Sequence, residues 1–270
     1  MQENAFTSHR STTRLLAVGA AALAVGALTV TSAEAAPSVG RVSSSLAAHE
    51  SHALHGLKSA GTASNTTVTS GNWSGYAAVG SAGAYKSVSS TWVQPSVTCT
   101  STNTYSSYWV GLDGYSNSAL EQTGTEADCI NGQAVYGAWW EVLPAAESAY
   151  SVNVLPGDHM SASVTDNANG TFTMTLTDST QGWTKSTTHA GSSGYQDSSA
   201  EVIAEATSVN GRIAKLSNFG TVGFSGSKAN GTTLPSSSNE IIMGGKSGDV
   251  LAQPSALSSG AFSDTWMNYS

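Results

Sequence analysis

The stretch Ala134-Val-Tyr-Gly-Ala-Trp-Trp-Glu-Val-Leu143 is rich in aromatic and β-branched residues and lies between Asn131-Gly132 and Pro144. This composition, bounded by turn-forming residues, favours a β-strand. Comparable runs recur along the chain, separated by glycine, proline and asparagine, at residues 72–79, 86–93, 105–111, 160–164, 171–177, 200–205, 222–224 and 240–243. No segment after residue 35 keeps a 3.6-residue apolar period over ten positions, so we expect no substantial helix there.

Many short strands of this kind must form two sheets, because each apolar face needs a partner that covers it. Asn167-Ala-Asn-Gly170 has the composition of a hairpin turn between two of the predicted strands. A repeat of 20 to 50 residues, which would indicate a propeller or a solenoid, is absent from the sequence. The sequence therefore predicts an all-β protein with one antiparallel β-sandwich domain over residues 71–270.

The N-terminal region has the pattern of a signal peptide. Arg10 and Arg14 precede an apolar run from Leu15 to Val30, and Ala33-Glu-Ala35 offers the small residues of a cleavage site. The apolar run is shorter than the roughly 20 residues that span a bilayer. We expect residues 1–35 to be removed and the protein to be extracellular, without a membrane partner after cleavage.

Residues 36–70 are rich in serine and alanine, and they carry His49, His52 and His55 at a spacing of three. This spacing could present a metal-binding face on a helix, but the segment lacks apolar periodicity and residues that would orient the rings. We interpret residues 36–70 as a pro-segment or linker, and we predict neither a metal site nor a cofactor for the protein.

Charge and cysteine content constrain the partners and the compartment. The net charge is −8, and only 10% of the residues are charged. Nucleic-acid binding needs clustered Lys and Arg, so we expect no nucleic-acid partner. The two cysteines, Cys99 and Cys129, fit one disulfide in an exported protein.

Three glutamates lie inside predicted strands, where charged residues are unusual in this chain: Glu141, Glu201 and Glu205. Because side chains alternate along a strand, Glu201 and Glu205 share one face and Val202 and Ala204 point to the other. If Val202 and Ala204 pack into the sandwich core, Glu201 faces a concave outer surface. These glutamates could be ordinary solvated residues, and the pattern alone does not choose among them.

Tryptophans stand close to these glutamates in the sequence. Trp139 shares a face with Glu141, and together with Trp109 and Trp140 it could wall a groove that removes water from a carboxylate and raises its pKa. A peptide-binding cleft would need such walls.

An amide group accompanies the carboxylates. The blocks Tyr108-Trp-Val-Gly-Leu-Asp-Gly114 and Leu120-Glu-Gln-Thr-Gly124 place Gln122 near Trp109 and Asp113. A glutamine on a strand can hold a water molecule and donate N–H to an oxyanion without ionising. The motifs His-Glu-x-x-His and Gly-x-Ser-x-Gly are absent from the sequence, so a zinc peptidase and a serine hydrolase of the α/β type are not expected.

Five blocks in one order resemble the eqolisins, the glutamic peptidases. The blocks are Asn72-Trp-Ser-Gly75, Trp109 to Gly114, Gln122 to Gly124, Ala138-Trp-Trp-Glu141 and Ala200-Glu-Val-Ile203, within residues 71 to 245. The resemblance implies two curved seven-stranded antiparallel sheets of the concanavalin or lectin-like kind. It also implies a zymogen that becomes an acid endopeptidase acting on polypeptides. Independently of the resemblance, we expect a monomer.

The resemblance further implies a catalytic pair, Gln122 and Glu201, with Trp109, Asp113 and Glu141 lining or supporting the site; we add Trp139 as a site wall. Glu121 stands before Gln122 where an apolar residue is more usual, and strand alternation should turn it away from the pair.

The expected mechanism uses Glu201 as a base that activates water and then returns the proton to the leaving amine. Gln122 stabilises the oxyanion. We expect Gln122 and a tryptophan N–H to lower the pKa of Glu201 by donating to it.

Other functions fit part of the pattern. A secreted glycoside hydrolase would use Glu141 and Glu201 as its two carboxylates, and a carbohydrate-binding lectin would use the tryptophans without catalysis. A glycosidase could lose Gln122 without losing activity, whereas a glutamic peptidase could not.

Overall fold

The computed structural model describes residues 49–52 and 65–269, and these contain only strands and connecting segments. The predicted signal peptide and most of the predicted pro-segment lie outside the described residues. No helix in the described ranges is long and apolar enough to cross a membrane. The first strands are β1 (His49–Ser51), β2 (Thr67–Ser70), β3 (Trp73–Val79), β4 (Ser87–Val93), β5 (Ser107–Leu112), β6 (Glu121–Ile130), β7 (Gln133–Val142), β8 (Ser148–Ala149), β9 (His159–Asp166) and β10 (Thr171–Asp178).

The remaining strands are shorter on average. They are β11 (Trp183–Ala190), β12 (Ser199–Glu205), β13 (Ser208–Val209), β14 (Arg212–Ile213), β15 (Thr221–Ala229), β16 (Thr232–Thr233), β17 (Asn239–Gly244), β18 (Val250–Pro254) and β19 (Phe262–Trp266).

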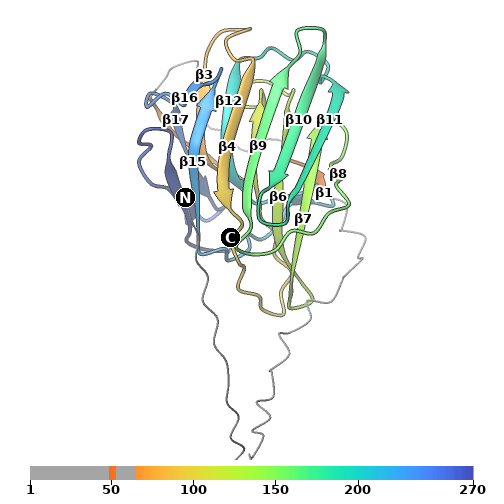
Figure 1. Ribbon diagram of the computed structural model, residues 1–270. Helices are drawn as coiled ribbons and strands as arrows, with labels where there is room; N and C mark the ends of the chain where they lie inside the picture. The colour runs from red at the N-terminus through yellow and green to blue at the C-terminus, as the bar shows by residue number, and fades with distance from the viewer. Residues whose placement is uncertain (1–48, 53–64, 270) are drawn as a thin grey trace, which may run out of the picture. The chain divides into compact units, whose positions relative to one another are not determined.

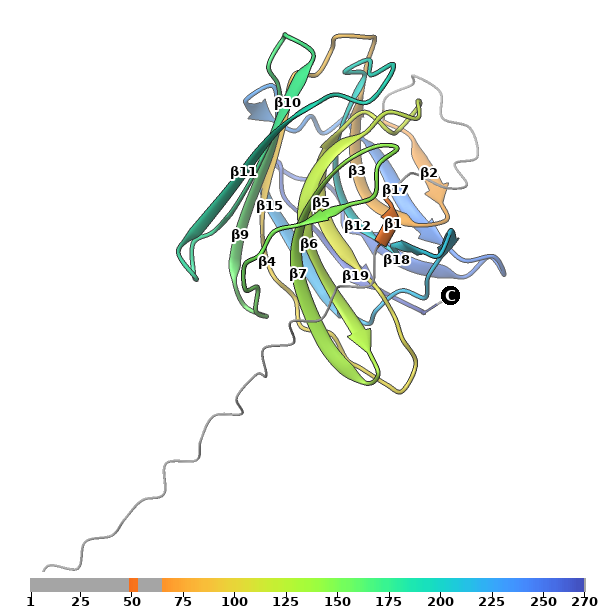
Figure 2. The same cartoon turned by 90° about the vertical axis from the view of Figure 1, so that its right-hand side faces the viewer.

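Most strands belong to one hydrogen-bonded path that folds over itself. Its order is β11-β10-β9-β4-β15-β19-β18-β17-β3-β12-β5-β6-β7-β8, with β16 beside β15 and β2 beside β17. The first part of this path packs face to face against its last part. β5 contacts β4 and β9, and β6 contacts β9 and β10. Figures 1 and 2 show these strands as two layers. The predicted all-β antiparallel sandwich is confirmed; seven strands in each sheet stays a prediction, because pairing continues from one layer into the other.

Two apolar clusters cover the two faces of β12. Val202 and Ala204 belong to the large core between the layers, as their alternation in the sequence predicted. Ile203 points the other way and packs in a second cluster with Trp109 and Trp139. Every residue of β12 is consequently buried, and the strand that carries Glu201 is held from both sides.

The strand predictions were correct for the runs rich in apolar residues. β6 was not among the predicted runs, although strand alternation was applied to Glu121 and Gln122 at its start; its sequence Glu-Gln-Thr-Gly-Thr-Glu-Ala-Asp-Cys-Ile contains three acids and a glycine. β11, β18 and β19 were not among the predicted runs either. β6 lies between β5 and β7, and nine of its ten residues are buried. The predicted hairpin Asn167–Gly170 does connect β9 to β10.

Two strands, β1 and β2, lie inside the range predicted to be the pro-segment. β2 pairs in parallel with β17, from Thr67 opposite Glu240 to Ser70 opposite Met243. The other pairings along the main path are antiparallel. The boundary at residue 70 stays a prediction.

The predicted disulfide between Cys99 and Cys129 is present and joins residues 30 positions apart. Cys129 lies in β6 and is fully buried. The disulfide therefore ties the segment before β5 to one of the strands of the site-bearing layer.

Replacing both cysteines by alanine should lower the free energy of unfolding by about 3 to 4 kcal/mol, because the unfolded chain gains the entropy of an open loop. Guanidinium denaturation of the variant and of the wild type measures the difference. Wild-type protein unfolded in the presence of a reductant is the control and should show a similar loss. An unchanged unfolding midpoint in the double variant would contradict the expectation.

Candidate active site

The register of four neighbouring strands aligns one row of residues on the face that points away from the other layer. Glu201 of β12 lies opposite Gly111 of β5, Gly111 lies opposite Gln122 of β6, and Gln122 lies opposite Glu141 of β7. Directly paired residues in antiparallel strands project to the same face. Glu201, Gln122 and Glu141 are all fully buried.

Gly111 lies in this row between Glu201 and Gln122. Strands lie about 4.8 Å apart, so the backbones of β12 and β6 are roughly 10 Å apart across β5. A Cβ atom at Gly111 would lie 3.0 Å from the Trp109 ring and 3.0 Å from a methyl carbon of Leu120. Glycine is needed here because the Trp109 ring and Leu120 occupy the place that a side chain would take.

The next row is aromatic. Ile203, Trp109, Gly124 and Trp139 follow one another across β12, β5, β6 and β7. A Cβ atom at Gly124 would come within 2.6 Å of the Trp109 Cβ, so only glycine allows the Trp109 side chain to lie where it does. This contact is a physical reason for the glycine of the Gln-Thr-Gly block.

Glu205 occupies the third row on the same face. Its carboxylate accepts a hydrogen bond from Trp109 Nε1 at 2.7 Å and another from Asn72 Nδ2 at 2.9 Å. Burial raises the pKa of Glu205, while the charge of His52 and these hydrogen bonds oppose the increase.

The expected hydrogen bonds to Glu201 are not formed. The side-chain amide of Gln122 donates instead to Glu141 Oε2 at 2.6 Å, and the indole of Trp109 donates to Glu205. Among the described residues no donor reaches either carboxylate oxygen of Glu201 or the side-chain oxygen of Gln122. The expectation that Gln122 and a tryptophan hold the pKa of Glu201 down is therefore wrong, because both donors have nearer carboxylates.

Burial instead raises the pKa of Glu201 well above its ordinary value, and the Ser199 hydroxyl, which lies too far away or at too poor an angle for a hydrogen bond to Glu201, opposes the increase only in part. The charges of Asp113 and Glu121 raise it further. Burial also raises the pKa of Glu141 to about 7, an increase that the charge of His52 opposes. Both carboxyl groups are thus easier to protonate than a glutamate in water.

Two other carboxylates hold the loop that leads into β12. Asp113 Oδ2 accepts the backbone N–H groups of Gln196 and Asp197, both at 2.7 Å, and Oδ1 accepts that of Ser198 at 2.9 Å. Glu121 Oε1 accepts the backbone N–H of Ser192 at 2.6 Å. Asp113 supports Glu201 indirectly, by fixing the backbone that precedes it.

Glu121 lies on the opposite face from Gln122, as strand alternation predicts. It pairs with Leu112 and Val142, whose side chains belong to the core between the layers. Burial raises its pKa to about 8. Glu121, at a position where an apolar residue is more usual, is thus a buried acid that anchors the loop at Ser192.

The structure adds residues to the site that sequence reasoning did not assign to it. His52 lies on this face and is fully buried, and it contacts Glu141, Glu147 and Glu205. Its spacing with His49 and His55 suggested a helix face, whereas His49 is in β1 and His55 lies outside the described residues. No local signal links residue 52 to strands more than 50 positions away.

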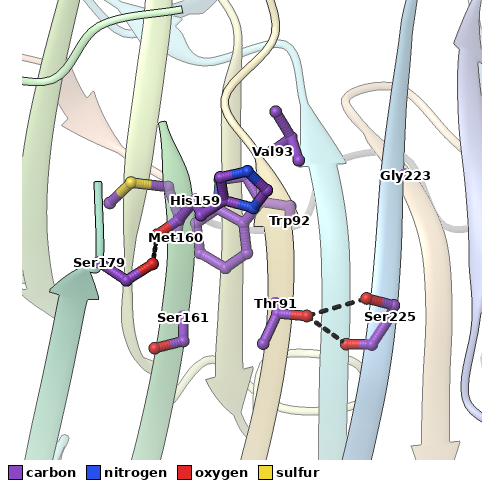
Figure 3. Close-up of a pocket in the computed structure, with 9 residues that line it drawn as sticks. All are labelled: Thr91, Trp92, Val93, His159, Met160, Ser161, Ser179, Gly223 and Ser225. Carbon is purple, nitrogen blue, oxygen red and sulfur yellow. Dashed lines mark hydrogen bonds between the residues drawn. The ribbon is translucent and has the colours of Figure 1, made fainter. Parts of the chain in front are cut away.

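A surface pocket of about 310 Å³ lies elsewhere, on strands β4, β9 and β15 (Figure 3). Its lining contains hydroxyl groups and the imidazole of His159, but no carboxylate. The described residues also include no cluster of three or more His, Cys, Asp or Glu arranged to hold a metal ion. The row of Glu201, Gln122 and Glu141 is the stronger candidate for chemistry.

The fold is a β-sandwich, and an amide and carboxyl groups align on one sheet face, so fold and site are both compatible with a glutamic peptidase. The sequence profile of the peptidase A4 family matches residues 71–266. The chain belongs to this family, the eqolisins.

Individual relatives agree with this placement. Aspergillopepsin-2 of Aspergillus niger is 28% identical over 157 residues, which cover 55% of each protein, so the chain spans about half the length of this relative. A crystal structure of scytalido-glutamic peptidase with a transition-state analogue inhibitor has a TM-score of 0.65 and 24% identity, covering 73% of this chain and 98% of that one. The crystal structure of aspergilloglutamic peptidase from Aspergillus niger has a TM-score of 0.56 at 25% identity, and the match covers 61% of this chain and 99% of that chain.

Replacing Asp113 by asparagine should lower the free energy of unfolding by about 3 kcal/mol, because an amide nitrogen would face N–H groups that the carboxylate now accepts. Urea denaturation measures this change. Asp249→Asn, which removes the same charge from an exposed position, is the matched control and should stay within about 0.5 kcal/mol of the wild type. Equal stability of the two variants would contradict a role for Asp113 in holding the loop.

Proposed function

We propose that this protein is a secreted acid endopeptidase in which Glu201 and Gln122 form the catalytic pair. The observation that carries the proposal is their alignment in one row of the sheet, with only Gly111 between them. Membership of a peptidase family supports polypeptides as substrates.

Hydrolysis would begin with a water molecule held between the Glu201 carboxylate and the Gln122 amide. Ionised Glu201 takes a proton from the water as its oxygen attacks the scissile carbonyl carbon. The amide N–H of Gln122 donates to the resulting oxyanion, a role worth roughly 3 to 4 kcal/mol in other hydrolases. Glu201 then gives its proton to the leaving nitrogen as the C–N bond breaks, which yields a carboxylic acid and an amine.

Glu141 would set the orientation of Gln122. When ionised, Glu141 can only accept, so it holds the amide N–H of Gln122 away from Glu201. When protonated, Glu141 can donate its O–H to the Gln122 oxygen, and the amide can then turn its N–H groups toward the oxyanion. Activity would therefore need Glu201 ionised and Glu141 protonated, which gives a bell-shaped dependence on pH. Its acid limb would lie above the ordinary pKa of a glutamate, because burial raises the pKa of Glu201.

The alternative function, a glycoside hydrolase, predicts a different spacing of the two carboxyl groups. It would use Glu141 and Glu201 as its two carboxyl groups, and these lie three strands apart in the row, roughly 14 Å between backbones. Retaining glycosidases hold their carboxyl groups about 5 to 5.5 Å apart and inverting ones about 6.5 to 9.5 Å. The wider backbone spacing and the intervening amide favour the peptidase.

Replacing Gln122 by alanine should lower kcat on a denatured protein substrate by about 100-fold or more, because the oxyanion loses its donor. Glu201→Ala should abolish hydrolysis, since the base is lost. Gln253→Ala, an exposed glutamine in β18, is the matched control and should keep wild-type activity. Circular dichroism checks the folding of each variant. Full peptidase activity in either site variant refutes the pair, and polysaccharide hydrolysis that survives Gln122→Ala would favour the glycosidase.

Replacing Glu141 by glutamine should extend activity to higher pH. Glutamine offers one donor group and one acceptor, as protonated Glu141 does, at every pH. The alkaline limb of the kcat/KM profile should move upward from about pH 7, the value to which burial raises the pKa of Glu141, while the acid limb stays with Glu201. Glu240→Gln is the control, because Glu240 lies on β17 outside this row. An unmoved alkaline limb would rule out Glu141 as its origin.

A further inference from the structure

His52 reaches the proposed active-site face through a short strand. β1 pairs with β13, with His49 opposite Val209 and Ser51 opposite Ser208. β13 follows directly after β12, the strand that carries Glu201 and Glu205. Pairing of β1 with β13 therefore delivers His52 to the end of the site where Glu205 lies.

The imidazole of His52 has an acidic group at each of its two ring nitrogens. Its Nδ1 lies 2.8 Å from Glu205 Oε2 and 3.4 Å from the Ser107 hydroxyl, and its Nε2 lies 3.1 Å from Glu147 Oε2. Only the protonated ring can donate from both nitrogens at once. The ring also stacks on Trp139, with centroids 4.0 Å apart and planes inclined by 7°, and a cation gains from an aromatic face.

The backbone of His52 is bound as well. Its N–H donates to Glu141 Oε2 at 3.2 Å, and its carbonyl oxygen accepts from Trp73 Nε1 at 3.2 Å. A site that contacts both peptide groups and the side chain recognises a histidine within a polypeptide, in an extended segment. Glu141 contacts Gln122 through the same oxygen, so this site adjoins the proposed catalytic pair.

We infer that Trp73, Trp139, Glu141, Glu147 and Glu205 form a subsite that binds a peptidyl histidine as its imidazolium, and that His52 occupies this subsite in the uncleaved chain. The inference rests on the proposed function in so far as the subsite serves substrates. The N-terminal segment would then compete with any polypeptide that carries a histidine near the bond to be cleaved.

The charges around the subsite define a pH window for binding. Burial alone lowers the pKa of His52, but the charges of Glu205 and Glu141 and the hydrogen bonds to Glu147 and Glu205 outweigh it and raise that pKa well above its ordinary value. Glu126 lies on the same face, in the row of Glu205 and Ser107. The bound ring therefore keeps its proton, whereas a free imidazole loses it above about pH 6.5.

Binding should weaken at both ends of this window. Above about pH 6.5 the free ligand must take up a proton before it binds. In acid the carboxylates become neutral and the imidazolium loses its counterions. The charge of His52 lowers the pKa of Glu205 and Glu141, so a bound imidazolium favours their ionised forms and is released as they protonate.

The test is calorimetric titration with N-acetyl-histidine N-methylamide at about pH 6. All proteins are the full chain with Glu201→Gln added, which prevents self-cleavage from removing His52. The His52→Ala variant should bind the ligand at least tenfold more tightly than the protein that keeps His52, and at least tenfold more tightly than it binds N-acetyl-glutamine N-methylamide. Adding Glu205→Gln should abolish the preference for histidine.

His189→Ala is the matched control, because His189 is an exposed histidine in β11, and it should bind like the protein with His52 in place. His52→Ser gives the same comparison if His52→Ala does not fold. Equal binding with and without His52, or equal binding of the histidine and glutamine ligands, would overturn the subsite. Binding does not depend on hydrolysis, so a protein that binds histidine as expected but cleaves no polypeptide would refute the peptidase proposal alone.

Discussion

The structure depends most on the register that aligns β12, β5, β6 and β7. This register places Glu201, Gln122 and Glu141 in one row and Ile203, Trp109 and Trp139 in the next. A shift of one residue would turn every side chain of a strand to the other face. Acids would then enter the apolar core, so the packing of Val110, Val202 and Ala204 between the layers fixes the site on the opposite face.

Burying so many acids in a chain with few basic residues has a thermodynamic consequence. Burial raises the pKa of Glu121 and Asp264 to about 8 and that of Glu141 to about 7. Because these folded-state values exceed the ordinary pKa of about 4, their contribution to stability is complete in acid and is lost as the pH rises toward 7 to 8. With respect to these three groups, the folded protein is therefore more stable in acid than near neutral pH.

The buried acids differ in whether hydrogen-bond donors stabilise their ionised form. Asp113 accepts from three successive backbone N–H groups, and Glu205 accepts from an indole and an amide. No donor in the described residues reaches Glu201. A buried carboxyl without donors is costly to ionise, so the pKa of Glu201 is raised, and carboxyl groups with strongly shifted pKa values are concentrated at functional sites.

Local sequence was enough to predict the strands with aromatic and β-branched residues, the hairpin at residues 167–170, the disulfide and the opposite faces of Glu201 and Val202. The strands and the faces of Glu201 and Val202 follow from composition and side-chain alternation, and the hairpin follows from turn composition. The disulfide follows from the presence of two cysteines in a chain with a predicted export signal. Local sequence was not enough to find the full extent of β6 beyond Gln122, because acids there are stabilised by neighbouring strands and not by their own sequence preference. Nor could it show that Gln122 donates to Glu141, or that His52 stacks on Trp139. Such contacts join residues 19 and 87 positions apart, so they arise only when the register and layer packing bring the strands together.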